Sequence, residues 1–402
     1  MADQTYHILY HHRTLSKDGQ NVHIEEMLKA FKDQGHSVTL VGPTPNKPDT
    51  PKGKKNEQDH PAFKSRLFHM MKKLLPSFIY ELLEYGYNLK AYRRLCAAID
   101  HQKPDFVYER YNLFMLAGVW AAKKYNLPLI LEVNAPLADE RKNHGQLSLY
   151  RFAKNIEQQT WQSASALITV SDVLADKIRT TGVSPEKIHV MHNGIDPDKF
   201  NKKNTDTGQL VQWYNLFGKT ILGFTGYARP WHKLDEVIRL IALLKNDHNL
   251  HLLAVGDGPA VNDCLKLAAD LGIQDRVTFT GPVPRENIAS YVNCFDIALQ
   301  PAVTDYASPL KLFEYMALGK AIIAPDQPNI REILTDHHDS LLFQPSSDDS
   351  FRQAIETLLA DPALRHRLSE NAEKTLSEKS FFWSTNAART LEIAENLLGK
   401  PE

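Results

Sequence analysis

Short apolar segments alternate along the chain with longer segments of helical periodicity. We predict strands in the first half at residues 6–10, 37–42, 105–110, 128–134, 166–171 and 188–193, and in the second half at 220–226, 250–256, 276–281, 296–302 and 321–325. Helical segments such as residues 21–34, which Gly35 closes, separate these strands. The alternation predicts an α/β protein with parallel sheets built from βαβ units.

The strand pattern is interrupted by a polar stretch, DPDKFNKKNTDTGQ, that begins at Asp196. The chain has 402 residues, which is too many for one ordinary hydrophobic core. We therefore predict two Rossmann-like, doubly wound domains at 1–195 and 220–376, a linker at 196–219, and a final helical segment, 377–402, that packs back on the first domain. In open sheets of this kind ligands bind beyond the carboxyl ends of the strands. The chemistry is thus expected in a cleft between the two domains.

Composition and charge narrow the class of protein. A hydrophobic fraction of 43% and a charged fraction of 24% are those of a soluble globular chain, and the net charge of -1 gives no bias toward nucleic acid. The three cysteines form no CxxC pair, which indicates a reduced chain without a thiolate metal site. No apolar run approaches the ~20 residues of a membrane span, and the N-terminal residues show no signal-peptide pattern. We expect a cytoplasmic protein that binds no nucleic acid and needs no metal or other cofactor.

The segment SPLKLFEYMALGKAII, residues 308–323, places a carboxylate among apolar residues. Helix neighbours three and four positions apart share a face, so Glu314 lies beside leucine and alanine, where an unpaired charge is costly. With Ser308 as N-cap and the following proline as first helical residue, the N–H groups of Leu310 and Lys311 are free to bind a phosphate. Lys311 adds a cation, and Glu314 can accept two hydrogen bonds from a vicinal diol such as ribose. The alternative is a structural pair between Lys311 and Glu314 on an ordinary helix.

This segment resembles the donor-binding segment of glycosyltransferase family 4, whose members are retaining enzymes of the GT-B fold. Further segments resemble elements of that family and follow its order: NGIDPDKF from Asn193, VGDGP from Val255, FTGPVPRENIASYV from Phe279 and the terminal FFWSTNAARTLEIAENLL. The resemblance covers nearly the whole chain. It implies that Glu314 holds the ribose of a nucleotide diphosphate sugar and that the preceding helix N-terminus holds the diphosphate.

The same resemblance implies further donor contacts. The glycine loop at Gly256 and the turn from Gly281 to Val283 let the backbone pack against the nucleotide, whose base is held by main-chain groups. In the first domain, Gly19 allows the backbone to approach the donor from across the cleft.

Two departures from the family pattern concern the diphosphate. The Arg and Lys that commonly grip it fall on Tyr227 and His232 in this chain. Arg229 and Lys233 lie close enough in sequence to take over, because the charge needs only to reach the phosphates. We therefore expect Arg229 and Lys233 to bind the diphosphate.

Two other departures concern the donor sugar or the acceptor. The acidic residue that the family often has eight positions before the ribose-binding Glu is here Tyr306, with Asp305 beside it. The His at a strand end of many relatives falls on Asn134, with Glu132 two residues earlier on the same face. These four residues are the candidates for that side of the site.

Residues 63–78, FKSRLFHMMKKLLPSF, combine apolar side chains at helical spacing with basic residues on the rest of the circumference. A basic amphipathic helix can lie in an anionic membrane interface, which would suit a lipid-linked acceptor. The pattern is equally that of a core-facing helix with a solvated basic side. Both interpretations stay open.

Together, these features predict a retaining glycosyltransferase that moves a sugar from a nucleotide diphosphate sugar to a glycan or lipid-linked acceptor. Arg229, Lys233 and Glu314 are its candidate catalytic residues. A nucleotide-sugar epimerase of similar fold is one alternative. A noncatalytic glycosyltransferase-like subunit is another, because several family positions carry different residues here.

Overall fold

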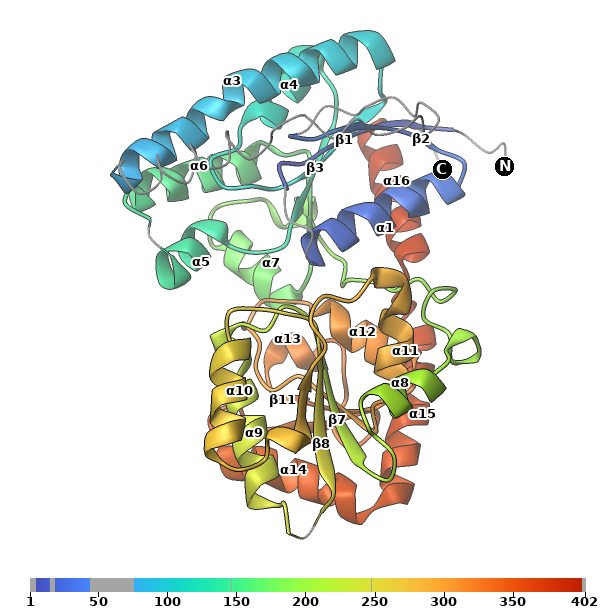
Figure 1. The fold of residues 1–402 in the computed structure, drawn as a ribbon. Coiled ribbons are helices and arrows are strands. Elements are labelled where there is room, and N and C mark those ends of the chain that lie inside the picture. Colours follow the sequence, from blue (N-terminus) through green and yellow to red (C-terminus); the bar gives the residue numbers. More distant parts are fainter. Residues whose placement is uncertain (1–4, 15–18, 44–75, 146, 247, 400–402) are drawn as a thin grey trace, which may run out of the picture.

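The computed structural model describes residues 5–14, 19–43, 76–145, 147–246 and 248–399. Within these residues the chain forms two six-stranded parallel sheets, one in each of two stacked lobes (Figure 1). The first sheet has the order β2-β1-β3-β4-β5-β6, with β1 (His7–His11), β2 (Ser37–Val41), β3 (Phe106–Arg110), β4 (Leu129–Val133), β5 (Ala166–Thr169) and β6 (Ile188–Val190). The second has the order β12-β11-β10-β7-β8-β9, with β7 (Thr220–Thr225), β8 (Leu250–Val255), β9 (Val277–Phe279), β10 (Ile297–Leu299), β11 (Ala321–Pro325) and β12 (Leu341–Phe343). Both orders reverse once, as in a doubly wound sheet.

Helices cover both faces of each sheet (Figure 1). Those of the first half are α1 (Gly19–Asp33), α3 (Ser77–Gln102), α4 (Ala117–Tyr125), α5 (Leu137–His144), α6 (Tyr150–Ser163) and α7 (Asp172–Arg179). Those of the second half are α8 (Gly208–Trp213), α9 (Leu234–Leu243), α10 (Val261–Asp270), α11 (Ile288–Asn293), α12 (Leu310–Ala317), α13 (Pro328–Arg331), α14 (Asp348–Ala360), α15 (Pro362–Glu378) and α16 (Trp383–Leu397). Short 3-10 turns are η1 (Pro185–Lys187), η2 (Lys202–Asn204), η3 (Pro230–His232), η4 (Gln274–Arg276) and η5 (Arg285–Asn287).

Successive residues of one strand enter two different cores. In β4, Leu129, Leu131 and Val133 lie in a core that α3, α4 and α6 complete, whereas Ile130 lies in the core that α1 and α16 complete. Strands buried on both faces carry continuous apolar runs instead of an alternating pattern. This double burial explains why the strands are readable in the sequence.

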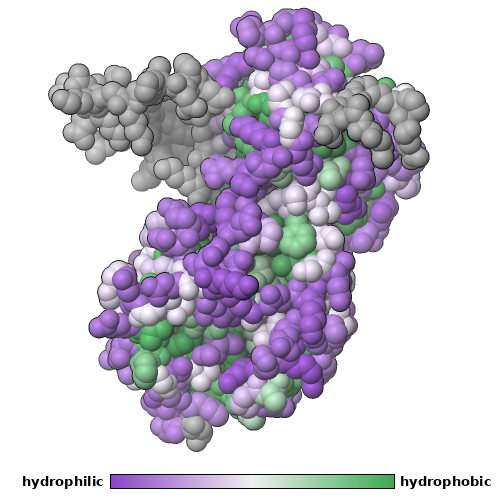
Figure 2. All heavy atoms as spheres, turned by 90° about the vertical axis from the view of Figure 1, so that its right-hand side faces the viewer, coloured by the Kyte–Doolittle hydropathy of each residue, from purple (hydrophilic) through white to green (hydrophobic). Residues whose placement is uncertain are grey.

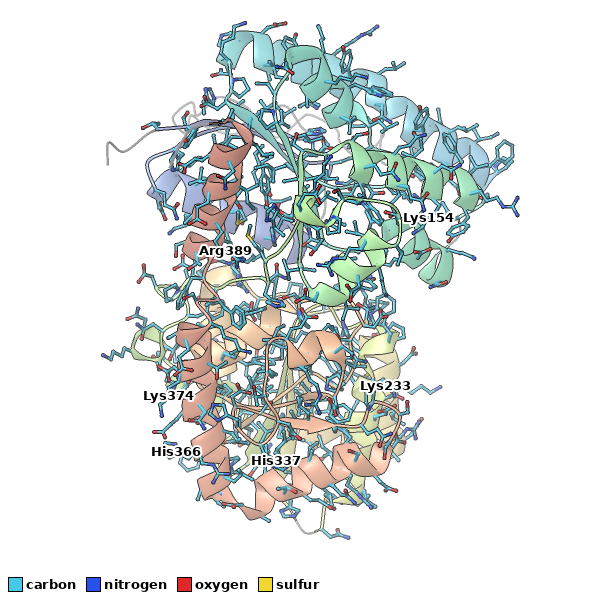
Figure 3. All side chains as sticks on the ribbon, turned by 180° about the vertical axis from the view of Figure 1, so that it is seen from behind. Lys154, Lys233, His337, His366, Lys374 and Arg389 are labelled. Carbon is cyan, nitrogen blue, oxygen red and sulfur yellow. The ribbon has the colours of Figure 1, made fainter. Side chains whose placement is uncertain are left out.

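The chain crosses between the lobes twice, and the two crossings lie side by side. Ile195 pairs with Phe382 in a parallel β-bridge, and a Cβ at Gly194 would lie 2.6 Å from the Phe382 carbonyl carbon. Helix α16 then packs against α1 in the first lobe (Figure 1). Arg389 of α16, labelled in Figure 3, donates a hydrogen bond of 3.2 Å to the carbonyl of Val190 at the end of β6. The C-terminal helix therefore joins the core of the first lobe.

In the described part of the chain, no helix has the length and apolar character to cross a bilayer. Figure 2 shows a face on which hydrophilic atoms dominate and hydrophobic atoms gather in small patches. Residues 63–75 of the amphipathic segment lie outside the described residues. Helix α3 begins just after them, and its second residue, Phe78, is 44% exposed.

Candidate active site

Helix α12 begins one residue later than the sequence predicts. Leu310 is its first residue, and Pro309 occupies the N-cap position. The hydroxyl of Ser308 instead accepts a hydrogen bond of 3.1 Å from the backbone N–H of Asn193. The prediction that Ser308 caps α12 is therefore wrong, because the segment that crosses between the lobes uses this hydroxyl. In the described structure no side chain caps α12, so its first N–H groups are available to a ligand.

Glu314 is buried, with 4% of its surface exposed, and its carboxylate has partners at the end of β7 and in the 3-10 turn η5. The Arg285 guanidinium forms an ion pair with Oε1, and the Thr225 hydroxyl donates to Oε2 at 3.3 Å. Val283, two residues before Arg285, packs against the core beside α12. The protein partner of the buried carboxylate is thus Arg285, and not Lys311 as in the alternative of a structural Lys311–Glu314 pair. In the sequence Arg285 is marked only as the one cation in the predicted loop after the strand at 276–281, and nothing local pairs it with Glu314.

Lys311 lies beside the loop that follows β7. Its ammonium group is 3.7 Å from the centroid of the Phe224 ring and would be 3.6 Å from a Cβ at Gly226. Burial lowers the pKa of Lys311 to about 7, although the charge of Glu314 opposes the shift. Near neutral pH the ammonium is therefore close to losing its proton, and a bound anion would stabilise the charged form.

His232, at the position of the family's Lys, is neutral at physiological pH. Burial, followed by the charges of Lys311 and Arg229, lowers the pKa of His232 to about 3. Its Nδ1 accepts a hydrogen bond of 3.2 Å from the backbone N–H of Arg229. The Arg229 guanidinium lies over the rings of Tyr227 and Trp231, 5.4 and 4.9 Å from their centroids. Because both cations act on His232, Lys311 and Arg229 share one electropositive neighbourhood, which we call the cationic site.

Lys233 is engaged differently. Its ammonium group pairs with Glu236 at 2.8 Å, and this hydrogen bond raises the pKa of Lys233. Figure 3 shows Lys233 at the edge of the second lobe. To bind a phosphate, Lys233 would have to break its ion pair with Glu236. Arg229 has no such competitor, because no carboxylate of the described residues forms a salt bridge with it.

The glycines of the loop after β8, predicted to bind the nucleotide, are required by the protein's own backbone. A Cβ at Gly256 would lie 2.2 Å from the carbonyl oxygen of Gly226, and one at Gly258 would lie 2.2 Å from that of Ala228. Gly256 also forms an antiparallel bridge with Gly281, whose φ of +71° lies in the left-handed region. The loops after β7, β8 and β9 are thus packed together on the side of the second lobe that carries Arg285 and the cationic site.

Tyr306 and Asp305 contact the first lobe. The Tyr306 ring is 8% exposed and packs in the core of that lobe, its hydroxyl donates to Glu140 at 2.7 Å, and its carbonyl accepts the Ser171 hydroxyl at 2.7 Å. Burial and the Glu140 charge raise the pKa of Tyr306, so its hydroxyl remains a donor. Asp305 pairs with Lys177 at 2.8 Å. Both side chains therefore join the lobes.

Glu132 is the centre of a buried polar cluster at the end of β4. Its carboxylate, 1% exposed, binds Arg110, the Asn134 amide and the Tyr108 hydroxyl, the last at 2.8 Å. Burial opposes its ionisation, but His23, Arg110 and these hydrogen bonds outweigh burial and lower the pKa of Glu132. Burial lowers the pKa of His23 to about 4, so at neutral pH Arg110 carries the balancing charge. Asn134, half-buried, is the more accessible of the two predicted residues.

Gly19 is the first residue of α1, and residues 15–18 before it lie outside the described part of the chain. Leu310, the first residue of α12, packs against the core that includes Ile24 and Met27 of α1. The two helix starts predicted to bind the donor therefore belong to helices that contact the same core at the junction of the lobes.

Comparison with known proteins defines the class. The structure resembles that of Anabaena Alr3699/HepE in complex with UDP, with a TM-score of 0.72 and 17% identity over 97% of this chain and 99% of that chain. It also resembles WaaG, a glycosyltransferase involved in lipopolysaccharide biosynthesis, with a TM-score of 0.68 and 16% identity over 97% and 99% of the two chains. Two facing parallel sheets of this kind are the GT-B fold.

Family models assign the chain within that class. Residues 17–199 match the model described as Glycosyltransferase Family 4, and residues 215–375 match the model described as Glycosyl transferases group 1. The chain therefore belongs to glycosyltransferase family 4.

Relatives with different names match the chain. A D-inositol 3-phosphate glycosyltransferase of Jonesia denitrificans is 23% identical over 394 residues, covering 94% of this chain and 91% of the relative. An alpha-D-kanosaminyltransferase of Streptomyces kanamyceticus is 26% identical over 225 residues, covering 55% of this chain and 58% of that enzyme.

Proposed function

We propose that this protein transfers a sugar from a nucleotide diphosphate sugar to a glycan or lipid-linked acceptor, with retention of anomeric configuration. The observation that carries the proposal is the placement of Lys311 and Glu314 on α12, whose N-terminus is uncapped, in a chain of a glycosyltransferase family. One helix thus supplies a cation and free N–H groups for a diphosphate and, one turn deeper, a carboxylate for a ribose diol.

Catalysis rests on stabilising the leaving diphosphate. The bond between the anomeric carbon and the diphosphate oxygen breaks while the acceptor oxygen bonds to the same face of that carbon, and a leaving phosphate oxygen takes the acceptor's proton. Arg229, Lys311 and the first N–H groups of α12 would bind the developing negative charge, with Lys233 as a further cation once it leaves Glu236. These protein cations supply the charge, so we propose no metal requirement.

Contacts between the lobes would exclude water from the transfer. Tyr306 and Asp305 hold the second lobe against α5 and α7 of the first, which favours transfer over hydrolysis of the donor. Asn134, which is half-buried, remains the more accessible candidate for a contact with the donor sugar or acceptor.

A lipid-linked acceptor would bring the protein to a membrane. We propose that residues 63–78 make a peripheral contact with anionic lipid at the inner face of the cytoplasmic membrane, which their basic amphipathic sequence supports. Co-sedimentation with vesicles that contain phosphatidylglycerol, compared with phosphatidylcholine vesicles, tests the contact. Equal pelleting with both would contradict it.

The test of the transfer uses the purified chain, radiolabelled nucleotide sugars, and membrane lipid extract or oligosaccharide acceptors. Transfer of label into lipid or glycan is expected, and nuclear magnetic resonance of the product should show the anomeric configuration of the donor. Interconversion of nucleotide sugars without an acceptor would instead identify an epimerase. Neither reaction, together with weak nucleotide binding, would identify a noncatalytic subunit.

A further inference from the structure

Arg285 is held from two sides. Its guanidinium forms the ion pair with Glu314, and its central carbon lies 4.7 Å from the centroid of the Phe200 ring. Phe200 is 3% exposed and follows the first crossing between the lobes. A guanidinium placed between an aromatic face and a carboxylate has little freedom to turn. Arg285 is therefore a fixed element of the second lobe.

Stability of the fold does not explain this pair. Glu314 is 4% exposed, and Leu318, four residues further on the same face, is fully buried. At such a position an apolar residue of similar volume is often as stabilising as the charged one, because the contact must repay the cost of removing the Glu314 carboxylate from water, while Arg285 stays 29% exposed. An ion pair at this position gives no clear gain in stability over an apolar side chain, which points to a functional use of the oriented carboxylate.

The contacts of the carboxylate leave room for a ligand. A carboxylate offers about four positions to hydrogen-bond donors, two on each oxygen. In the described structure Arg285 takes a position on Oε1 and Thr225 takes one on Oε2, at 3.3 Å. One position per oxygen remains, which matches the two donors of a vicinal diol. The two protein contacts also fix the plane of the carboxylate, and so the direction in which those positions face.

We propose that Arg285 is a positioning residue that orients Glu314 to read the two ribose hydroxyls of the nucleotide. The proposal rests on the proposed function, since it assigns Glu314 to the ribose. Arg285 acts through the carboxylate and does not contact the reacting sugar, so its loss should raise the KM for the donor much more than it lowers kcat. It should also remove the distinction between a ribose diol and a sugar without hydroxyls.

The experiment pairs protein variants with ligand variants. Calorimetry measures the affinity of the wild-type chain and of Arg285→Gln, Arg285→Lys and Glu286→Gln for the diphosphates of uridine and guanosine, and for their 2′,3′-dideoxy analogues. In the wild-type chain we expect the dideoxy analogue to bind at least about tenfold more weakly, because two hydrogen bonds to a charged acceptor are lost. Glu286 is exposed in the same 3-10 turn, so Glu286→Gln is the matched control and should keep this ratio.

In Arg285→Gln the ribonucleotide should bind nearly as weakly as its dideoxy analogue. Arg285→Lys should recover part of the difference in affinity between the two ligands, because it keeps the positive charge but lacks the planar guanidinium. A wild-type ratio that persists in both Arg285 variants would overturn the positioning role while leaving the proposed function intact. An equal loss of affinity for both ligands would also overturn it, since that result assigns Arg285 to the phosphates. If the wild-type chain binds neither of these nor the diphosphates of adenosine, cytidine and thymidine, the proposed function itself fails and the positioning role falls with it.

Discussion

The hydroxyl of Tyr306, a residue of the second lobe, donates a hydrogen bond of 2.7 Å to the carboxylate of Glu140 on α5 of the first lobe. The ring of Tyr306 is buried in the core of that first lobe, and Ser171 binds its carbonyl oxygen. At this position many family members carry an acid. In this chain the residue joins the two lobes.

Replacing Tyr306 tests that role. Tyr306→Phe keeps the ring and removes one hydrogen bond, at an expected cost of about 1 kcal/mol in the free energy of unfolding. Tyr306→Glu places a second carboxylate beside Glu140 in an apolar core, so we expect the lobes to separate. Small-angle X-ray scattering should then show a larger radius of gyration. Glu378→Gln, at the exposed end of α15 and away from the contacts between the lobes, serves as the control. An unchanged radius in Tyr306→Glu would contradict the joining role.

The lowered pKa of Lys311 predicts a pH dependence of nucleotide binding. Burial sets this pKa to about 7, so the ammonium carries its charge below that pH and loses it above. A bound diphosphate favours the charged form, so binding above pH 7 takes up a proton and affinity falls by up to about tenfold per pH unit. The window of pH 7–9 avoids the phosphate's own titration near pH 6.

Calorimetry in buffers of different ionisation enthalpy measures this proton uptake directly. Lys311→Arg keeps its charge throughout the window and should bind with little dependence on pH. A wild-type affinity that is flat from pH 7 to 9 would show that Lys311 does not face the diphosphate.

Arg229 and Lys233 should contribute unequally. Arg229 shares the cationic site with Lys311, so Arg229→Ala should weaken nucleotide diphosphate binding by at least about tenfold, the loss of a charge-assisted hydrogen bond. Lys233 is already paired with Glu236, and Lys233→Ala should change affinity by no more than about twofold. Titration calorimetry of the two variants measures both affinities. A larger loss of affinity in Lys233→Ala than in Arg229→Ala would show that the diphosphate does not bind at the cationic site.

Gly256 and Gly281, in the loops after β8 and β9, should differ in their tolerance of a methyl group. Gly256→Ala would bring a Cβ to 2.2 Å from the Gly226 carbonyl oxygen at a φ of +132°, so we expect it to destabilise the second lobe by more than about 3 kcal/mol. Gly281→Ala meets open space and loses only the preference for its left-handed φ, at about 1–2 kcal/mol. Urea unfolding measures both, and equal losses would show that backbone packing is not what requires Gly256.

The fold could be read from the sequence because its strands are buried on both faces. In β4, Leu129, Ile130 and Leu131 all lie in a core, so the segment is a continuous apolar run and cannot be taken for a half-exposed strand. The importance of Glu314 could also be predicted from the sequence, because a carboxylate among apolar helix neighbours must have a partner for its charge.

The partners themselves could not be read from local pattern. Arg285 is 29 residues away from Glu314 in the sequence, and the backbone N–H of Asn193, which donates to the Ser308 hydroxyl, is 115 residues away from it. Both contacts depend on how loops meet in space. The same holds for Tyr306, whose position in the sequence suggests a sugar contact but whose side chain packs in the other lobe.

The most direct test of the account is the affinity of Glu314→Ala for nucleoside diphosphates. Calorimetry with uridine and guanosine diphosphates should detect binding to the wild-type chain and to Glu378→Ala, a control at an exposed glutamate that ends α15, and none to Glu314→Ala at the same concentrations. If Glu314→Ala binds as tightly as the wild-type chain, the buried carboxylate has no nucleotide to hold, and the site described here is not the donor site.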